Sequence, residues 1–180
     1  TNKNIEEGAI ITMSAHMPNF SLVKEKADYV EGTDPTYAKY DFSGYTPGTL
    51  TGDVMNQILP EGKYNEMYNA FLDMIAEYAN NVDGTILFRP FHENTGSWFW
   101  WGAAFCDAAT YKSVWKYTVE YLRDEKGVHN FLYVYGPGSE ANDVDEYGER
   151  YPGDDYVDMV GFDIYNDNPC LLYTSPSPRD

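Results

Sequence analysis

The sequence has little positive charge. Its 180 residues include 12 Lys and Arg against 29 Asp and Glu, which gives a formal net charge of −17. Proteins that bind nucleic acid or an anionic membrane surface present clustered cations, so this balance argues against both partners. No apolar run approaches the ~18–20 residues that span a bilayer, which argues against membrane insertion.

Cysteine is also scarce, and several common signals are missing. The two cysteines, Cys106 and Cys170, do not make a disulfide framework and do not fix a redox compartment. No glycine-rich phosphate loop follows any apolar segment, which argues against a nucleotide-binding sheet. The polar residues 1–4 show no secretion signal, but we expect both ends of the chain to be cut, so that absence carries no weight.

Aromatic residues, in contrast, are abundant. They make up 17 % of the chain, with 17 Tyr, 9 Phe and 4 Trp, and three of the Trp lie within residues 98–101. The C–H faces of a sugar stack on such rings and carboxylates accept hydrogen bonds from its hydroxyls, so this composition suits a neutral carbohydrate ligand. The other interpretation is that most of the Tyr belong to the core or the surface.

Four short apolar segments predict buried strands. They cover residues 8–15, 85–88, 131–135 and 156–162. The polar stretch 20–60 predicts an extended loop with one short helix near residues 52–59. Another short helix is expected near residues 143–151.

Helical periodicity between these strands predicts two long helices. One covers residues 65–82, with Asn65 as its N-cap, and the other covers residues 107–124, with Asp107 as its N-cap and Gly127 as its stop. The apolar spacing of the first helix predicts an inward face made of Met67, Phe71, Met74, Ile75, Tyr78 and Val82.

The alternation of strands and helices predicts an α/β fold with parallel strands and right-handed crossovers. A doubly wound sheet and a (β/α)₈ barrel both fit, and the missing phosphate loop favours the barrel. In either fold the site lies at the carboxyl ends of the strands. The predicted strands start about 49 residues apart, so eight units need on the order of 390 residues, and the chain is expected to be the middle of a barrel.

Glu93 is the strongest candidate for a catalytic group. It follows the predicted strand 85–88 and His92, and it precedes the tryptophan-rich residues 98–101. A carboxyl group walled by aromatic rings is poorly solvated, so we expect its pKa to rise and Glu93 to serve as a general acid. The alternative is that Glu93 forms an ion pair with Arg89 and only closes the strand end.

Other candidates lie at the same strand ends. His16 and His92 suit hydrogen bonds to substrate hydroxyls, although each can also be a satisfied core histidine. Asp163 and Tyr165 are two residues apart, so in an extended segment both side chains point the same way. The alternative for Asp163 is to accept backbone hydrogen bonds at the strand end.

The tryptophans at 98, 100 and 101 suit a sugar-binding platform. Packing in the core is the alternative, and we expect it for at least one of them. Glu140 and the acidic residues 143–149 are expected to lie on the solvated surface.

Three segments carry a resemblance to a known family. The central one reads Arg89-Pro90-Phe91-His92-Glu93-Asn94-Thr95-Gly96-Ser97-Trp98-Phe99-Trp100-Trp101-Gly102. It resembles the hallmark segment of glycoside hydrolase family 26, chiefly endo-β-1,4-mannanases. Residues 10–19 and 151–165 resemble the third and sixth barrel strands of that family.

The resemblance implies a partial (β/α)₈ TIM barrel, about strands three to six, and retaining hydrolysis of β-1,4-mannosidic bonds in mannan or galactomannan. Glu93 matches the acid/base, and His92 and Trp98 match residues around the sugar to be cleaved. The other matches are cleft residues, His16, Asp163 and Tyr165, and supporting residues, Arg89 and Trp100. The resemblance implies no metal and no organic cofactor. It also implies a secreted, cell-surface or periplasmic bacterial protein.

The chain departs from the family pattern at its carboxyl end. The family nucleophile is a Glu at the end of strand seven, and the chain stops after strand six, so no residue is assigned that role. Residues 170–180 resemble translated adapter sequence, which limits the catalytic domain to residues 1–169 and makes Cys170 non-native. We expect the chain alone to be inactive.

The sequence is also compatible with other functions. The barrel can be a catalytically inactive glycan-binding module, or it can act on β-1,3-xylan or mixed-linkage glucan. A metal-dependent hydrolase that uses His16, His92 and Asp163 is disfavoured because their spacing is not compact.

Overall fold

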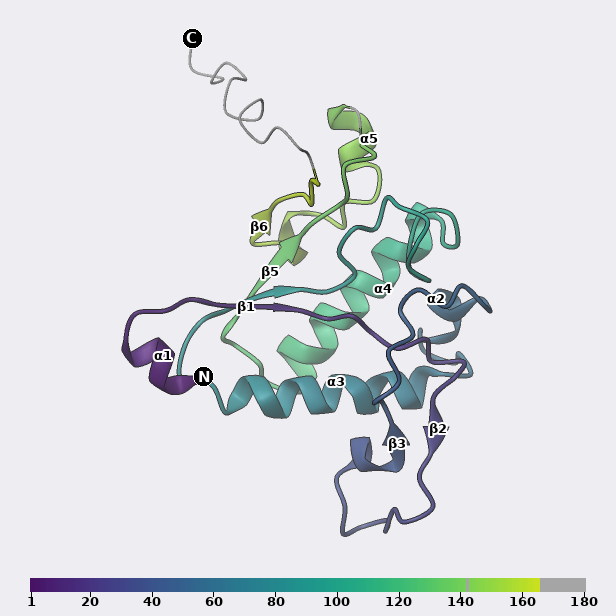
Figure 1. Cartoon of the computed structure of the whole chain (residues 1–180), viewed down its shortest axis with the longest axis vertical. Coiled ribbons are helices and arrows are strands. Elements are labelled where there is room, and N and C mark those ends of the chain that lie inside the picture. Colours follow the sequence, from purple (N-terminus) through teal and green to yellow (C-terminus); the bar gives the residue numbers. More distant parts are fainter. Residues whose placement is uncertain (142, 166–180) are drawn as a thin grey trace.

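A computed structural model describes residues 1–141 and 143–165 of the chain. Its centre is a four-stranded sheet of β1 (Ile11–Ser14), β4 (Ile86–Arg89), β5 (Phe131–Tyr135) and β6 (Met159–Val160). All its strand pairs are parallel, and the strands lie side by side in chain order, β1-β4-β5-β6 (Figure 1). A parallel sheet in chain order confirms the predicted section of a barrel.

Helices and a small hairpin connect these strands. The helices are α1 (Asn2–Glu6), α2 (Val54–Gln57), α3 (Asn65–Asn80), α4 (Ala108–Glu120) and α5 (Val144–Gly148). Shorter turns are η1 (Thr36–Lys39), η2 (Tyr121–Glu125), which is a π-helical turn, and η3 (Asp154–Tyr156). The hairpin pairs β2 (Lys24–Glu25) with β3 (Tyr40–Asp41) in antiparallel fashion.

The two faces of the sheet differ in how they are covered. Ile86 and Phe88 on β4 are fully buried and belong to the core that contains the inner faces of α3 and α4, whereas Leu87 and Arg89 point to the other face and are half-buried. The ring of Phe88 stacks on that of Phe131 at 4.6 Å between centroids. In a (β/α)₈ barrel, helices cover the outer face of the strands and the inner face points into the barrel. The sheet of this chain has the same arrangement, with the inner face half-buried.

The buried face of α3 overlaps the predicted one but is turned toward Tyr68 and Leu72. Phe71, Ile75 and Val82 are buried as predicted, and Met67 and Met74 pack half-buried against the core. Tyr68, Leu72 and Ala79 are fully buried or nearly so, together with Ile75, whereas Tyr78 is 43 % exposed. The prediction weighted large apolar residues, but the small side chains of Ala76 and Ala79 turn the buried face toward them. Asn65 is also not the N-cap, because its side chain donates a hydrogen bond to the carbonyl of Ile58 at 2.8 Å instead.

Helix α4 follows the prediction closely. The Asp107 carboxylate accepts a hydrogen bond from the Thr110 amide at 2.7 Å, as an N-cap should. The helix runs on through the η2 turn, and Gly127 follows with a left-handed φ of 64°. The predicted stop is therefore confirmed.

The edges of the sheet and the long loop show the largest differences. β1 alternates between half-buried and exposed residues, and β6 is two exposed residues long, because each lies at an edge of the described sheet. Residues 20–60 contain the predicted short helix, α2, but also the β2–β3 hairpin, which no periodic pattern indicated. The predicted tail at 170–180 lies outside the described residues.

Candidate active site

The predicted site residues lie at the carboxyl ends of three strands. His16 follows β1, His92 and Glu93 follow β4, and Asp163 and Tyr165 follow β6. Since these strands are parallel and belong to one sheet, their carboxyl ends share one edge. The following contacts show that the side chains meet there.

Glu93 is held in a fixed position by its backbone and by both carboxylate oxygens. Its φ is 53°, and its amide donates to the carbonyl of Gly136 at 2.7 Å. The indole Nε1 of Trp98 donates to Oε2 at 2.7 Å, and the Tyr165 hydroxyl donates to Oε1 at 2.9 Å. Only 8 % of the surface of Glu93 is exposed, so its carboxyl group is buried and accepts two hydrogen bonds.

Arg89 does not neutralise Glu93. Its Nη2 forms an ion pair with Asp163, at 2.6 Å to Oδ1, and its Nη1 donates to Ser14 Oγ at 3.2 Å. The alternative reading of Glu93 as the ion-pair partner of Arg89 is therefore wrong. The pair instead ties the end of β4 to the segment that follows β6.

The two histidines form an edge-to-face pair. The ring centroids of His16 and His92 are 4.6 Å apart, and both rings contact Phe99. Burial, followed by the nearby His16 and Arg89, lowers the pKa of His92 to about 4. His92 is therefore neutral at neutral pH and offers imidazole nitrogens as hydrogen-bonding groups. Its Nδ1 is buried and has no partner within residues 1–141 and 143–165.

The tryptophans divide between site and core. Trp98 is 40 % exposed and contacts Glu93, whereas Trp100 and Trp101 are buried. Trp100 donates to the carbonyl of Met17 at 3.3 Å and packs against Phe20, so it supports the loop from the core side. The expectation that at least one tryptophan belongs to the core is confirmed.

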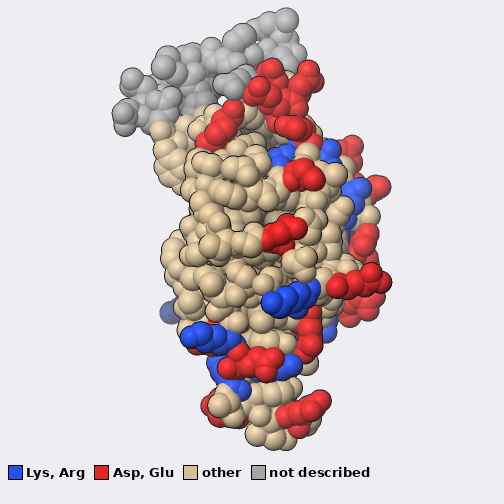
Figure 2. All heavy atoms as spheres, turned by 90° about the vertical axis from the view of Figure 1, so that its right-hand side faces the viewer, with Lys and Arg blue, Asp and Glu red and all other residues tan. Residues whose placement is uncertain are grey.

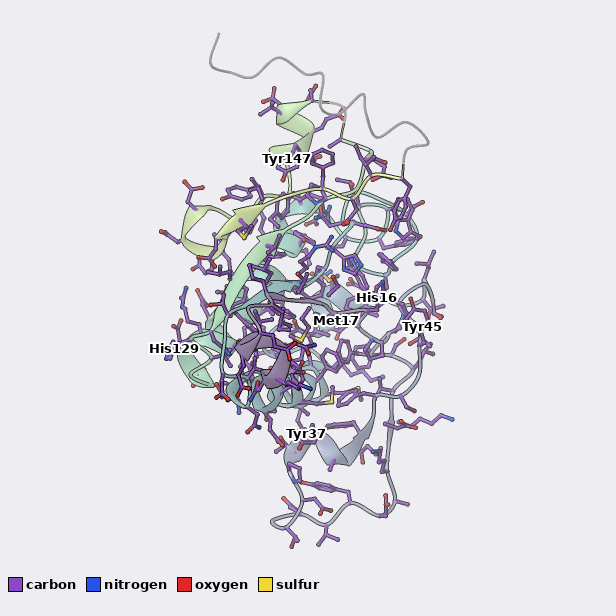
Figure 3. The ribbon with its side chains drawn as sticks, turned by 60° about the vertical axis from the view of Figure 1, so that its left-hand side comes forward. His16, Met17, Tyr37, Tyr45, His129 and Tyr147 are labelled. Carbon is purple, nitrogen blue, oxygen red and sulfur yellow. The ribbon has the colours of Figure 1, made fainter. Side chains whose placement is uncertain are left out.

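Three site residues were missed at the sequence level. Phe99 stacks on Trp101 at 4.4 Å and touches both histidines. Tyr45 is 76 % exposed, and its ring centroid lies 5.8 Å from that of His16. Figure 3 labels both residues. Gly96 lies directly under the Trp98 indole. Tyr45 belongs to a polar loop without periodicity, so no sequence signal pointed to it.

The acids of this site have other partners than a metal. Asp163 is engaged with Arg89, and Glu140 accepts a hydrogen bond from Thr95 Oγ1 at 2.8 Å. In the described part of the chain, no three His, Cys, Asp or Glu side chains are grouped to hold a metal ion. Within the same residues, no helix is long and apolar enough to cross a membrane.

The surface charge agrees with the composition. On the face that Figure 2 shows, Asp and Glu are spread among Lys and Arg, and no basic patch gathers there. Nothing on this face indicates a nucleic-acid-binding surface. The site as a whole offers a fixed carboxyl group, the neutral imidazole of His92, the His16 ring and exposed aromatic rings.

Comparison with known proteins places this site in a family context. The family model described as Glycosyl hydrolase family 26 matches residues 2–173. A mannan endo-1,4-beta-mannosidase of Bifidobacterium adolescentis is 42 % identical over 167 residues, which cover 89 % of this chain and 14 % of that protein.

Solved structures of the same family are also similar to this chain. The catalytic domain of a Bacillus sp. JAMB-750 GH26 endo-beta-1,4-mannanase is 38 % identical with a TM-score of 0.75, over 90 % of this chain and 38 % of that one. A GH26 beta-mannanase from Bacteroides ovatus is 31 % identical with a TM-score of 0.76, over 94 % and 45 %. The chain thus spans less than half the length of each of these relatives.

Proposed function

Since the chain belongs to glycosyl hydrolase family 26, we propose that it forms part of an enzyme that hydrolyses β-1,4-mannosidic bonds in mannan or galactomannan. The observation that carries this proposal is the buried Glu93 carboxyl group, fixed between the Trp98 indole and the Tyr165 hydroxyl. The names of the relatives support the substrate class, because those compared above are mannanases or mannosidases.

In this proposal Glu93 is the general acid and base. It protonates the glycosidic oxygen as the bond breaks, and it later removes a proton from the water that releases the sugar. A retaining enzyme needs a second carboxylate ~5–5.5 Å away as nucleophile. The family resemblance implies that this group is a Glu at the end of strand seven, and we propose that position in the complete barrel. Asp163 is not assigned the role, since it pairs with Arg89.

The remaining residues bind the sugar or hold other site residues in position. Trp98 offers an exposed ring for stacking. His16 and the neutral His92 offer hydrogen bonds to hydroxyl groups. Asp163 acts through Arg89, since its ion pair fixes the strand ends, and Tyr165 positions the Glu93 carboxyl group. No metal or cofactor takes part in this chemistry.

The decisive variant is Glu93→Gln in the complete catalytic domain that contains this chain. We expect it to abolish hydrolysis of mannan but to affect aryl mannosides with good leaving groups far less, because these need little protonation. Glu7→Gln, at an exposed carboxyl group beyond α1, is the matched control and should hydrolyse both substrates normally. Equal loss on both substrates would remove the general-acid role.

The same assay separates the other functions. Binding of mannan without hydrolysis by the complete domain would favour an inactive glycan-binding barrel. Preference for β-1,3-xylan or mixed-linkage glucan would move the substrate class within the family.

The cellular location of the enzyme and the bounds of its catalytic domain are also proposed. A polysaccharide substrate lies outside the cell, so the enzyme is proposed to be secreted, surface-bound or periplasmic in a bacterium. We also propose that the catalytic domain occupies residues 1–169 and that 170–180 is a non-native tail.

A further inference from the structure

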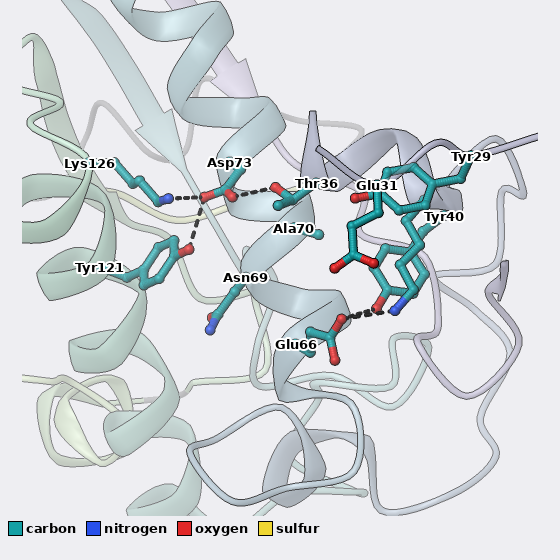
Figure 4. A pocket seen from close by; sticks show the side chains of 11 residues that line it. Tyr29, Glu31, Thr36, Tyr40, Glu66, Asn69, Ala70, Asp73, Tyr121 and Lys126 are labelled. Atoms are coloured by element: carbon teal, nitrogen blue, oxygen red, sulfur yellow. Dashed lines mark hydrogen bonds and ion pairs between the residues drawn. The ribbon is translucent and has the colours of Figure 1, made fainter. Parts of the chain in front are cut away.

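A cavity lies beside helix α3. It has a volume of about 680 Å³ and lies between α3, the η2 turn and the segment of β3 and η1, as Figure 4 shows. That volume is within the range of small-ligand sites, ~300–1,000 Å³. We propose that this cavity binds a short neutral oligosaccharide and acts as an accessory site. The choice of ligand rests on the proposed function above.

One face of α3 forms the floor of the cavity. Glu66, Asn69, Ala70 and Asp73 line it, and their spacing of three, four and seven residues places them on one side of the helix. This side differs from the one that packs toward the sheet through Leu72 and Ala79. Ala70 is 3 % exposed, and its small side chain leaves room that a larger residue would fill. The cavity is thus separate from the strand ends that carry Glu93.

Polar groups are fixed at two ends of this floor. At one end the Asp73 carboxylate accepts hydrogen bonds from Tyr121 at 2.9 Å and Thr36 at 2.7 Å and pairs with Lys126 at 2.7 Å. At the other end Glu66 accepts from Lys39 and from the Tyr40 hydroxyl, both at 3.0 Å. Such pre-positioned donors and acceptors match the alternating hydroxyl groups of a sugar.

Aromatic rings supply the apolar part. Tyr29, Tyr40 and Tyr121 all line the cavity, and Tyr29 is half-buried. Within the described residues, the Tyr29 hydroxyl and the Glu31 carboxylate, which also lines the cavity, have no hydrogen-bond or ion-pair partner. These two groups are therefore free to bind a ligand without first breaking a contact.

The charges disfavour an anionic ligand. Three carboxylates and two ammonium groups line the cavity, from Glu31, Glu66, Asp73, Lys39 and Lys126, so the sum is −1. An anion meets a net repulsion here, and the choice of a neutral ligand over a cation rests on the proposed function. A neutral hydroxylated ligand can use all five groups as donors or acceptors.

The test measures binding to insoluble mannan in the complete catalytic domain, with Glu93→Gln in the background to prevent cleavage. Tyr29→Ala removes a ring and Ala70→Leu fills the floor, and each should weaken binding by about fivefold to tenfold. Tyr78→Ala, at a 43 % exposed tyrosine of the same helix outside the cavity, is the matched control and should bind as the parent does. With Glu93 intact, both variants should hydrolyse a short aryl mannoside at the parental rate, which shows that they fold.

The outcomes separate this site from the proposed function. Mannan hydrolysis by the parent together with unchanged binding by Tyr29→Ala and Ala70→Leu would refute the accessory site and leave the enzyme in place. Absence of mannan hydrolysis together with weaker mannan binding by both variants would support the accessory site and refute the enzyme.

Discussion

Gly96 lies beneath the ring that holds the candidate acid, so adding one methyl group there should disturb the site. A Cβ at position 96 would lie 2.5–2.7 Å from three carbon atoms of the Trp98 indole. Real Cβ contacts are never that short, so the ring must move. The φ of Gly96 is not left-handed, and alanine can therefore adopt the backbone without strain. The change acts on Trp98 and not on the loop.

The expected cost follows from the hydrogen bond that moves with the ring. Trp98 is 40 % exposed and can swing outward, but its Nε1 then leaves Glu93 Oε2, now 2.7 Å away. A typical hydrogen bond contributes about 0.5–1.5 kcal/mol net, which corresponds to roughly 2- to 13-fold in kcat/KM. Because the ring moves toward solvent, stability should change by less than about 1 kcal/mol.

The assay compares kcat/KM on mannan and Tm for Gly96→Ala, Trp98→Ala and the double variant in the complete domain. Since both changes remove the same hydrogen bond, the double variant should be no slower than Trp98→Ala. Gly148→Ala is the control, because a Cβ there meets nothing within 4 Å. Fully additive losses would refute the reasoning, because they would mean that Gly96 acts without Trp98.

Three further changes test the electrostatics and the caps. Because the pKa of His92 is about 4 in the fold and about 6.5 unfolded, the unfolded chain takes up a proton first on acidification. The free energy of unfolding should fall by about 3 kcal/mol between pH 6.5 and 4. Urea titrations at several pH values should show a smaller fall in His92→Gln than in the parent. An equal fall in both proteins would contradict the role of His92. Asn130 Nδ2 donates to three carbonyls beyond and at the end of α3, at 2.9–3.2 Å, so Asn130→Asp should lower stability by about 1–3 kcal/mol in the same assay. Asp107→Ala should cost about 1 kcal/mol through the lost cap on Thr110, and a Tm equal to wild type would disprove the cap.

The sequence predicts the alternating strands and helices because each buried segment is short and strongly apolar. β5 coincides with its predicted range, 131–135. The hairpin of β2 and β3 escapes prediction because its strands are two residues long and pair through backbone groups. The rotation of α3 escapes because small residues such as Ala79, rather than large ones, decide which face can approach the sheet.

The site is predictable where residues follow a strand end. The grouping of Glu93, Asp163 and Tyr165 follows from parallel strands that share an edge. Which carboxyl group Arg89 pairs with does not follow, because Glu93 and Asp163 are equally plausible by position along the chain. The pairing depends on how the strands are placed in the sheet, which brings Asp163 Oδ1 to 2.6 Å from Arg89 Nη2.

The backbone after β4 adopts a conformation that the residue types there do not predict. Phe91 and Glu93 have φ angles of 49° and 53°, a left-handed region that bulky side chains avoid at a cost of about 1–3 kcal/mol each. Three hydrogen bonds hold the segment there: Tyr111 Oη donates to the Phe91 carbonyl, Trp101 Nε1 donates to the His92 carbonyl, and the Glu93 amide donates to Gly136. Glycine would fit this turn better, but it would carry no carboxyl group. The strained turn therefore accounts for where the carboxyl group sits, and the surrounding aromatic residues make that turn stable.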